Sequence, residues 1–570
     1  MAPYGRVHSR AYEVKRSGAR TLLAAALLAG GAALLAARTP AATPSPAGPM
    51  LAAITDREIR ADVRFLADDA LEGRAPSTHG GDLAARYVAT RFKLLGLKPG
   101  APDGSYFQQV PIVESNVDAS AGLTVTAPGG SEQLKVSDDA VLWTGVEDPD
   151  VTLDADLVFV GYGINAPEQH WNDYAGIDVK GKVVLMMVND PPATTSEPTL
   201  FGGKALTYYG RWTYKYEEAA RQGAAGAILI HTTASASYPW NVVQTAWTGN
   251  HYSLPVETGQ PTLRLKGWVT DDAAQKIAAR AGKNLDELRA AAAVRGFAAV
   301  PLGARVKTAL HQTLARKQSP NVIGMLPGTN PSQSVVYTAH YDHFGIRDPR
   351  PGDPPNADRI FNGAVDNASG VAGILAIAES MTRASSKPGR SIYFVATTAE
   401  ESGLLGSEYL SKHPYMPVDQ IAANINVDSL NVVGPTRDLA VLGAERSSLG
   451  PMLTTIVKAR GREVTGDNEP GAGHFFRSDH FPLAKVGVPA VSIANPEHFI
   501  GKDPAFAKQQ RDDYTNHRYH QPSDEYRDTW DLGGAIEDLK ALAVLGWRVA
   551  GAPAMPAYHK SEPFAAPRQH

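Results

Sequence analysis

The chain has 570 residues, of which 43% are hydrophobic and 20% are charged. This length and composition predict a globular protein of two or three domains rather than a disordered chain. The 55 basic and 59 acidic side chains give a formal net charge of −4, so no overall basic field favours nucleic acid or an anionic membrane as a partner. Cysteine is absent, which excludes disulfides, thiolate metal sites and cysteine nucleophiles. Any metal ion must therefore be bound by His, Asp and Glu.

The first 50 residues are typical of an export signal followed by a linker. Five basic residues precede an uncharged Leu/Ala-rich run over 22–37, and prolines at 40, 44, 46 and 49 follow among small residues. The apolar run is short for a membrane span. We therefore expect a signal peptide and a Pro/Ala linker over 1–50, with a periplasmic or secreted product that has no stable membrane association. The alternative is an uncleaved signal anchor, which would export the same residues.

Two helices are predicted at the start of the mature chain. Thr55 begins a Thr-Asp-Arg-Glu sequence with the form of a capping box, and apolar residues follow it at helical spacing. A second helical pattern ends at Gly96, a residue that suits a left-handed cap. Its apolar face carries Ala84, Val88, Phe92 and Leu95.

The segment from about 140 to 305 has a different texture. Apolar runs at 157–160, 183–188 and 227–230 predict strands, and 216–221 predicts a helix, with glycines between them. No cluster of ligand-type residues occurs here. We expect this segment to act as a lid, a partner surface or a source of stability.

From about Val322 onward, predicted strands and helices alternate. The strands are 335–339, 392–397, 423–427 and 490–493, and the helices are 370–381 and 447–460. This alternation predicts an α/β sheet covered by helices.

Acidic and histidine residues follow three of these strands. The first strand runs into His340-Tyr341-Asp342-His343, the second into Glu400-Glu401, and the third into Asp428. The carboxyl ends of strands line the ligand crevice of open α/β sheets, so these residues should converge. Each motif alone is weak, because a glutamate pair is usually solvated surface. Their joint placement at strand ends indicates a site.

Two further motifs complete a metal-ligand set. Asp366 lies in a glycine-framed turn before a helix, and His520 is held by the proline two residues later. Two zinc ions a few ångströms apart need roughly three protein ligands each, with one carboxylate shared. We expect His340 and Asp428 at one ion, Glu401 and His520 at the other, and Asp366 as the bridge.

The neighbours of these ligands have predicted supporting roles. Asp342 lies on the same side of the strand as His340, so it should hydrogen-bond the imidazole and set its tautomer. Glu400 should face away from Glu401, which suits a general base that takes a proton from a zinc-bridging water. Two alternatives remain open, in which His343 replaces His340 or His517 replaces His520.

Three other residues are candidates for substrate contact or oxyanion stabilisation. Arg477 and His480 lie in the sequence Arg-Ser-Asp-His, which could equally be a salt-bridged loop. Tyr519 could donate a hydrogen bond to a developing oxyanion, but an aromatic residue beside a ligand is more often a packing residue.

These motifs resemble the co-catalytic zinc aminopeptidase family, which also contains glutamate carboxypeptidases, glutaminyl cyclases and the transferrin receptor ectodomain. The motifs that carry the resemblance are 339–343, 363–370, 398–403, 426–428 and 519–520, and 66–74 resembles the start of these enzymes. Residues 181–184 and 223–227 are similar to parts of the protease-associated domain that several members carry.

The resemblance implies an α/β/α sandwich with a mixed, mostly parallel sheet and an inserted, β-rich protease-associated domain. The implied division is 51–140 for the N-terminal part of the catalytic domain, 141–305 for the insert, 306–555 for the catalytic zinc peptidase domain and 556–570 for a tail.

The activity implied is that of a metallo-aminopeptidase, a hydrolase with two Zn²⁺ ions that removes N-terminal residues from peptides. The alternative is a carboxypeptidase or dipeptidase on the same site, which would need a basic pocket for the substrate carboxylate. A glutaminyl cyclase would use one zinc ion, and a binding protein would not need Glu400. The oligomeric state stays open.

Overall fold

The computed structural model describes residues 48–118, 122–349 and 352–568. The predicted signal and all but the last three residues of the predicted linker lie outside these ranges. Residues 48–52 form a short helix, α1 (Gly48–Ala52). Within the described ranges, no helix combines the length and the apolar character needed to cross a bilayer.

Four parallel strands form the centre of the sheet that carries the predicted ligands. They match the four predicted strands and are β14 (Asn330–His340), β17 (Arg390–Thr397), β18 (Ile421–Asn426) and β21 (Ala490–Ile493). Their spatial order is β17–β14–β18–β21. At the two ends, β13 (Val300–Leu326) pairs antiparallel with β17 and β19 (Asp438–Leu442) pairs antiparallel with β21. The predicted α/β class with a mixed, mostly parallel sheet is confirmed.

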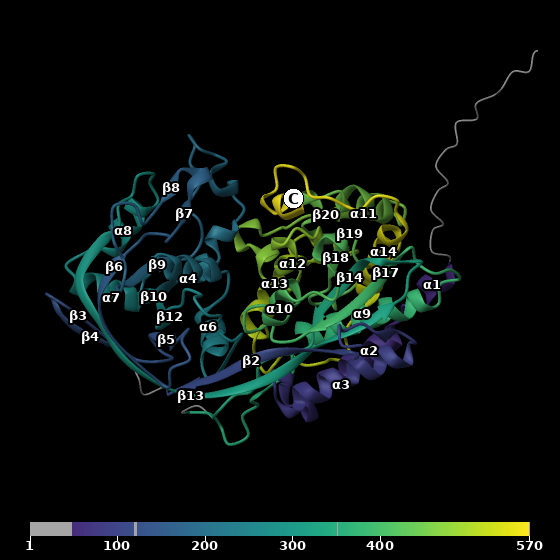
Figure 1. Ribbon diagram of the computed structural model, residues 1–570, viewed down its shortest axis with the longest axis horizontal. Helices are drawn as coiled ribbons and strands as arrows, with labels where there is room; N and C mark the ends of the chain where they lie inside the picture. Colours follow the sequence, from purple (N-terminus) through teal and green to yellow (C-terminus); the bar gives the residue numbers. More distant parts are fainter. Residues whose placement is uncertain (1–47, 119–121, 350–351, 569–570) are drawn as a thin grey trace, which may run out of the picture. The chain divides into compact units, whose positions relative to one another are not determined.

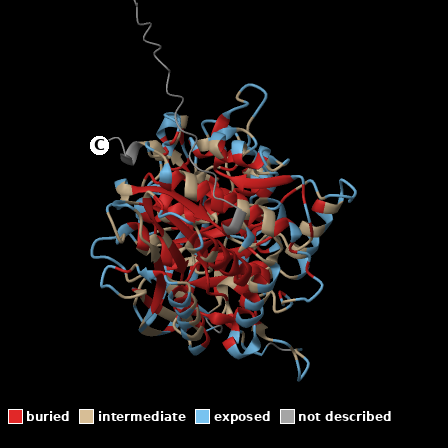
Figure 2. Ribbon diagram, turned by 90° about the vertical axis from the view of Figure 1, so that its right-hand side faces the viewer, coloured by how far each residue is buried: buried red, intermediate tan, exposed pale blue. Residues whose placement is uncertain are grey.

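Helices cover both faces of this sheet (Figure 1). Successive side chains of a strand point to opposite faces, so Val335 and Tyr337 enter one core while Val336 enters the other. The first core contains α2 (Asp56–Leu66), α3 (His79–Leu94), α9 (Gly370–Thr382), α11 (Leu449–Lys458) and α14 (Gly533–Gly551). The second contains α10 (Leu405–Lys412) and α12 (His480–Lys485). Buried residues concentrate along the strands between these layers (Figure 2).

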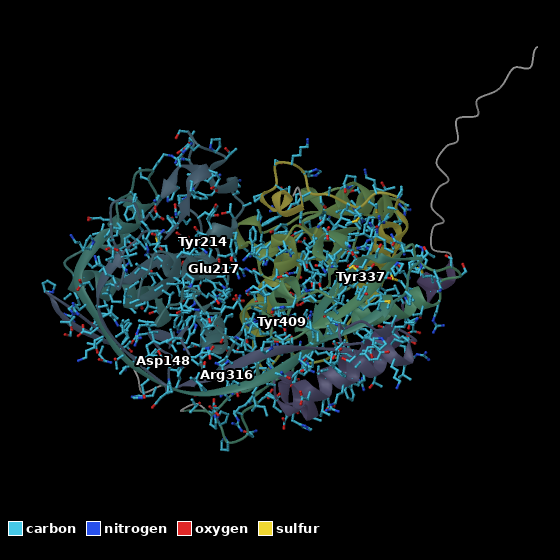
Figure 3. The ribbon with its side chains drawn as sticks, viewed as in Figure 1. Asp148, Tyr214, Glu217, Arg316, Tyr337 and Tyr409 are labelled. Atoms are coloured by element: carbon cyan, nitrogen blue, oxygen red, sulfur yellow. The ribbon has the colours of Figure 1, made fainter. Side chains whose placement is uncertain are left out.

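Tyr337 joins the sheet to the C-terminal helix. Its side chain is fully buried on β14, and its hydroxyl donates to the Leu542 carbonyl oxygen of α14 at 2.8 Å (Figure 3). A side chain on Gly546 would overlap the hydroxyl, because a Cβ there would lie 1.9 Å from it. This close approach fixes α14 against the strand that ends in His340.

The first two predicted helices are present, but one of the expected caps is absent. Thr55 precedes α2 as predicted, yet its side chain makes no capping hydrogen bond and its Oγ1 is buried without a partner. The expected capping box at Thr55 is therefore wrong. Gly96 has the predicted left-handed conformation, with φ of +78°, just after α3.

A second sheet contains the strands predicted between 140 and 305. Its central strands run parallel in the order β6–β9–β10–β12. Helices α7 (Asp271–Arg280) and α8 (Leu285–Ala292) cover one face, and α4 (Trp212–Arg221) and α6 (Trp240–Trp247) cover the other. The strands are β6 (Asp150–Phe159), β9 (Val183–Met187), β10 (Gly226–His231) and β12 (Leu265–Thr270).

One long strand belongs to both sheets. The first part of β13 pairs with β6 in the second sheet, and residues 312–322 pair with β2 (Phe107–Val117) in the first. Strands β3 (Leu123–Ala127) and β4 (Gly130–Leu134) also belong to the second sheet. The division with an insert at 141–305 stays a prediction, and this pairing places 123–134 with the same sheet as the predicted insert.

Candidate metal centre and pocket

The carboxyl ends of two central strands and the loop before α9 bring the first group of predicted ligands together. His340 is the last residue of β14, and Asp428 follows β18 by two residues. The Nε2 atom of His340 lies 3.2 Å from Oδ1 of Asp366 and 3.4 Å from Oδ1 of Asp428. One nitrogen and two carboxylate oxygens therefore face a common point.

A second group forms on the other side of Asp366. The Nε2 atom of His520 lies 3.2 Å from Oε2 of Glu401 and 3.5 Å from Oδ2 of Asp366. The two carboxylate oxygens of Asp366 thus face different groups, as a bridging ligand requires. This donor set of imidazole nitrogens and carboxylate oxygens fits two divalent cations of the zinc type.

The two alternative histidines lie in different places. His517 is exposed, and its Nδ1 lies 3.2 Å from Oδ1 of Asp513 on the same helix, so it is not brought to the site. His343 is buried, and its Nδ1 lies 2.5 Å from Oε1 of Glu401, while its Nε2 has no partner. His343 therefore contacts the carboxylate oxygen of Glu401 that does not face His520. Its donor atom also groups with those of Asp366 and Glu401 within 4.8 Å.

Asp342 supports the site in a way that differs from the expected one. Its backbone carbonyl, rather than its carboxylate, is nearest to Nδ1 of His340, at 3.3 Å against 3.8 Å. A carbonyl only accepts, so the proton sits on Nδ1 and Nε2 is free to bind a cation. The Asp342 carboxylate accepts instead from the backbone N–H groups of Glu400 at 3.1 Å and Glu401 at 3.4 Å. It holds the turn that carries both glutamates.

That turn separates the two glutamates. Ala399 has a left-handed backbone with φ of +53°, which is costly for a residue with a Cβ. The chain then directs Glu400 toward His340, with 3.9 Å between Oε2 and Nε2, and Glu401 toward His520. Glu400 therefore faces His340 and Glu401 faces His520, although one donor atom of each glutamate also lies within 4.8 Å of the other and of a ring nitrogen of His340.

The Asp366 loop is held by a carboxylate to which the sequence assigned no role. Asp524 is buried and accepts hydrogen bonds from the backbone N–H groups of Val365 at 3.1 Å and Asp366 at 3.0 Å. Burial raises the pKa of Asp524 to about 6. Its position four residues after His520 was visible in the sequence, but nothing local indicated which amides it would meet.

Arg74 links the N-terminal segment to the loops that carry the predicted ligands through hydrogen bonds. Its side chain is fully buried and donates to the carbonyl oxygens of Tyr341 at 2.7 Å, Asn362 at 2.5 Å and Gly363 at 2.9 Å, and to that of Leu66. Burial lowers the pKa of Arg74 to about 10, so it stays charged at neutral pH and offsets part of the carboxylate charge. The sequence offered no signal for this role beyond the motif that contains it.

The electrostatics of the cluster are those of a cation-binding site. Burial acts to lower the pKa of His340 and His520, but the carboxylates around them raise it, for His520 to about 9. Burial acts to raise the pKa of Asp366, but hydrogen bonds from the two histidines hold it well below the usual range. The cluster therefore attracts positive charge, which divalent ions can supply in place of protons.

Glu400 differs from the ligands in its ionisation. Burial, together with the nearby carboxylates Glu401 and Asp428, raises the pKa of Glu400 well above its usual range. The side chain therefore binds a proton more readily than a solvated glutamate does.

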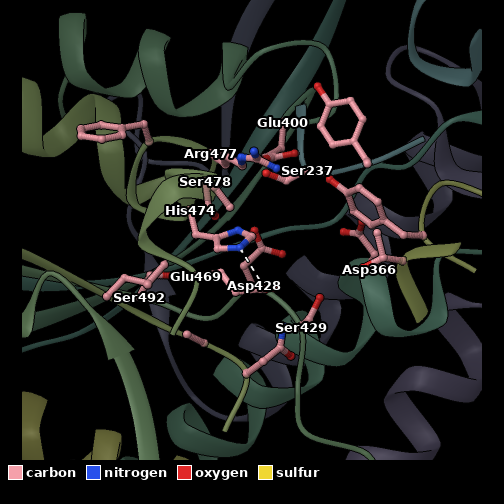
Figure 4. Close-up of a pocket in the computed structure, with 18 of the residues that line it drawn as sticks. Ser237, Asp366, Glu400, Asp428, Ser429, Glu469, His474, Arg477, Ser478 and Ser492 are labelled. Carbon is pink, nitrogen blue, oxygen red and sulfur yellow. Dashed lines mark ion pairs between the residues drawn. The ribbon is translucent and has the colours of Figure 1, made fainter. Parts of the chain in front are cut away.

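The ligands open into a cavity of about 880 Å³. Its lining includes Asp366, Glu400 and Asp428 together with residues from the second sheet's helices and loops, such as Ser237 (Figure 4). The predicted insert, residues 141–305, thus contributes side chains directly to the pocket, although its sequence showed no cluster of ligand-type residues.

The three substrate-contact candidates have different positions. Tyr519 and Arg477 line the cavity, whereas His480 does not: it is fully buried, with its ring 4.8 Å from that of Phe475. The structure therefore does not bring His480 to the pocket, because the α12 helix turns it into the core. Arg477 donates to the Ala236 carbonyl oxygen at 3.0 Å, and its buried Nε has no partner.

Arg211 is a lining residue that the sequence reading missed. It precedes α4, is 8% exposed, and its Nε is buried without a hydrogen-bond partner. Burial and the nearby Arg477 lower the pKa of Arg211 to about 10. Arg211, just before α4, and Arg477, in the loop before α12, therefore bring positive charge to the same cavity.

The segment that contains the site is similar to a known peptidase family. Residues 321–544 match the family model described as Peptidase family M28, and this segment contains all five predicted ligands and Glu400. The resemblance inferred from the motifs is thus confirmed over these residues.

Two curated proteins illustrate the similarity. Aminopeptidase NAALADL1 of Mus musculus is 33% identical over 139 residues, which is 23% of this chain and 16% of that protein. A glutamate carboxypeptidase 2 homolog of Caenorhabditis elegans is 28% identical over 205 residues, which is 34% of this chain and 23% of that protein. The matched part of the chain spans less than a quarter of the length of either relative.

Solved structures with a similar course of the chain include two bacterial enzymes. The aminopeptidase from Aneurinibacillus sp. strain AM-1 has a TM-score of 0.49 and 18% identity, with 89% of this chain and 96% of that chain covered. The zinc aminopeptidase BSAP from Bacillus subtilis has a TM-score of 0.45 and 18% identity, with 87% and 96% covered.

Proposed function

We propose that this chain is an exported aminopeptidase that uses two zinc ions to hydrolyse N-terminal residues from peptides. The observation that carries the proposal is the placement of Asp366, whose two oxygens face His340 on one side and His520 on the other. Export rests on the N-terminal sequence alone, and peptide substrates follow from the M28 match.

The residues that would hold the ions are those predicted from the sequence. His340 and Asp428 would hold one ion, Glu401 and His520 would hold the other, and Asp366 would contact both. Zinc bound there would lower the pKa of a shared water towards about 7 and polarise the scissile carbonyl. The donor set, with its free imidazole Nε2 atoms and paired carboxylates, suits this chemistry.

Glu400 acts as the general base and then as the acid. Its raised pKa lets it accept a proton from the attacking water and pass it to the nitrogen of the leaving amine. Asp342 keeps Glu400 in place by accepting its backbone N–H. Because water is the nucleophile, no covalent intermediate with the chain is needed.

Tyr519 is proposed as a donor to the oxyanion. Burial and the nearby carboxylates raise the pKa of Tyr519 well above its usual range, so its hydroxyl stays protonated and can donate. It lines the cavity next to the ligand His520.

One observation favours the second candidate, a carboxypeptidase or dipeptidase. Arg211 and Arg477 line the same cavity, and each has a buried Nε without a partner. Guanidinium groups of this kind suit a substrate carboxylate. Either function would use the same ligands and Glu400.

The test uses zinc-reconstituted protein and two copies of one mixed-sequence peptide, one with a free and one with an acetylated N-terminus. Mass spectrometry follows the products over time. Stepwise loss from the free N-terminus alone is the expected result. Trimming of both peptides from the C-terminus would transfer the assignment to a carboxypeptidase, and cleavage of neither would contradict the aminopeptidase proposal.

A further inference from the structure

One side of the cavity is an apolar wall supplied by α4 and α6, outside the M28-matched segment. Trp212 begins α4, and the wall continues along α6. The residues of α6 that line the cavity are Val242, Val243, Ala246 and Trp247. Val242 and Val243 are buried, while Trp212 and Trp247 are partly exposed. The indole surfaces therefore have area left to cover a ligand.

This wall stands beside the turn that carries the general base. The ring of Trp212 lies 3.8 Å from the position that a Cβ would take at Gly403. The N–H of Gly403 in turn donates to the carbonyl oxygen of Glu400 at 2.9 Å. Trp212 thus lies next to the Glu400 turn, and Leu404 in the same turn also lines the cavity.

Ring contacts with neighbouring aromatic residues support the two tryptophans of the wall. Trp247 stacks on Trp143 with 4.1 Å between ring centroids and 12° between planes, and His251 lies 5.9 Å from both rings. Trp212 meets Trp247 edge-on at 5.1 Å. A preformed apolar surface of this kind binds a side chain without the cost of ordering the site.

Two pairs of charged residues lie near the wall. Lys412 lies 2.8 Å from Glu408 on α10, and Glu217 accepts from the Tyr208 hydroxyl at 2.6 Å and lies 3.9 Å from Lys485. These pairs reduce the charge at this end of the wall. At the other end, the guanidinium of Arg211 lies 5.7 Å from the centre of the Trp212 ring. The indole surfaces of the wall itself are apolar and select a ligand side chain by the apolar area that it can bury.

The position of Glu400 decides which part of a peptide meets the wall. A proton must pass from Glu400 to the nitrogen of the leaving amine, so that nitrogen lies on the Glu400 side of the scissile carbon. A residue attached to this nitrogen would then extend toward the turn beside Trp212, and the amino-terminal residue would lie on the opposite side of the carbon.

We infer that Trp212 and Trp247 form the subsite for the residue that follows the scissile bond and select peptides with an aromatic or large aliphatic side chain there. The inference rests on the proposed peptidase function. It assigns a role in specificity to a segment in which the sequence indicated no chemistry.

The experiment measures kcat/KM for a set of amidated tetrapeptides that share a leucine at the first position. The second residue is glycine, alanine, leucine or phenylalanine, and amidation removes the C-terminal carboxylate that Arg211 and Arg477 could bind. The wild-type protein is expected to favour phenylalanine over glycine by roughly ten- to a hundredfold, the range typical of apolar pockets.

Three variants test the wall directly. Trp212→Ala and Trp247→Ala should each reduce the phenylalanine-to-glycine ratio to a few-fold, mainly through KM, while Trp212→Phe should keep most of it. Tyr209→Ala is the matched control, because Tyr209 is an aromatic residue of the same segment that does not line the cavity. Should Trp247→Ala fail to fold because Trp143 loses its stacking partner, Trp212→Ala carries the test alone.

The outcomes separate the inference from the function on which it rests. Cleavage of the peptides by the wild-type protein with no preference at the second residue would overturn the inference and leave the peptidase proposal standing. A preference that both Trp212→Ala and Trp247→Ala retain would also overturn it. Failure of the wild-type protein to cleave any of the four peptides would contradict the proposed function itself.

Discussion

The two sheets share an architecture but differ in what their strand ends carry. Each has parallel strands covered by helices on both faces. In one, β14 ends in His340 and the chain after β17 and β18 provides Glu401 and Asp428. In the other, β10 ends in His231, which contacts the Tyr238 carbonyl oxygen and aromatic rings instead of carboxylates. The architecture creates a crevice, and the residues at the strand ends decide whether chemistry occurs in it.

The two regions also treat buried titratable groups differently. Around Asp366, buried histidines and carboxylates meet one another, so their charges compensate. In the second region, His251 is buried among tryptophans, and burial lowers its pKa to about 4. The first arrangement suits cations, and the second favours a neutral histidine. The following variants, from the largest expected effect on activity to the smallest, test this contrast.

Asp366→Ala should abolish zinc binding at the proposed metal centre. In the proposed centre Asp366 contacts both ions, so the variant should lose bound zinc as well as turnover. We expect kcat to fall by more than the roughly 10²–10⁴-fold that a general base contributes. Metal analysis after dialysis and peptide turnover measure the two effects. Asp358→Ala, an exposed residue of the preceding loop, is the control. Retention of two equivalents of zinc by the Asp366 variant would refute the bridge.

Glu400→Gln should separate catalysis from metal binding. The variant loses the base but none of the five ligands, so we expect full zinc content and a kcat lower by roughly 10²–10⁴-fold. Glu401→Gln is the matched comparison and should lose zinc. Near-normal turnover in Glu400→Gln would remove the proposed mechanism.

Asp524→Asn should lower the affinity of the site for zinc without removing a predicted ligand. An amide has no charge and only one accepting oxygen, whereas the carboxylate accepts from the Val365 and Asp366 N–H groups as a charged group and contacts the Val365 N–H through both of its oxygens. The Asp366 loop therefore loses part of its support. Loss of a partner of this kind typically costs 10–100-fold in metal affinity or activity. Competition with a zinc chelator measures the affinity. The exposed neighbour Glu525→Gln should match wild type, and equal affinity in both variants would exclude the supporting role.

His251→Phe should change acid stability with the least effect on activity at neutral pH. The folded protein holds the pKa of His251 at about 4, below the unfolded value of 6.5, so only the unfolded chain gains a proton within this window. The free energy of unfolding should therefore fall by about 3 kcal/mol as the pH drops from 6.5 to 4.

Urea denaturation at pH 7 and at pH 4 measures the two stabilities. The phenylalanine variant keeps a ring beside the stacked pair Trp143 and Trp247 and should lose the fall in unfolding free energy that protonation of His251 causes. If the variant and the wild type were destabilised equally by acid, His251 would not be a neutral buried group.

The sequence by itself determined the α/β class, the four central strands and the positions of the ligand motifs. It could do so because buried parallel strands have apolar runs of characteristic length, and their carboxyl ends meet at one edge whatever the connections between them. The separation of Glu400 from Glu401 was likewise predictable, since adjacent side chains point in different directions.

Only the tertiary structure decided which groups hold that edge together and what lines the rest of the cavity. Arg74 and Asp524 act on backbone groups of loops far away in the chain, and Trp212 meets Gly403 across nearly two hundred residues. The tertiary structure also decided that His480 packs into the core and that the Asp342 carboxylate accepts from the backbone of the turn that carries Glu400 and Glu401. Such contacts depend on how separate segments pack, and no local period or spacing in the sequence encodes them.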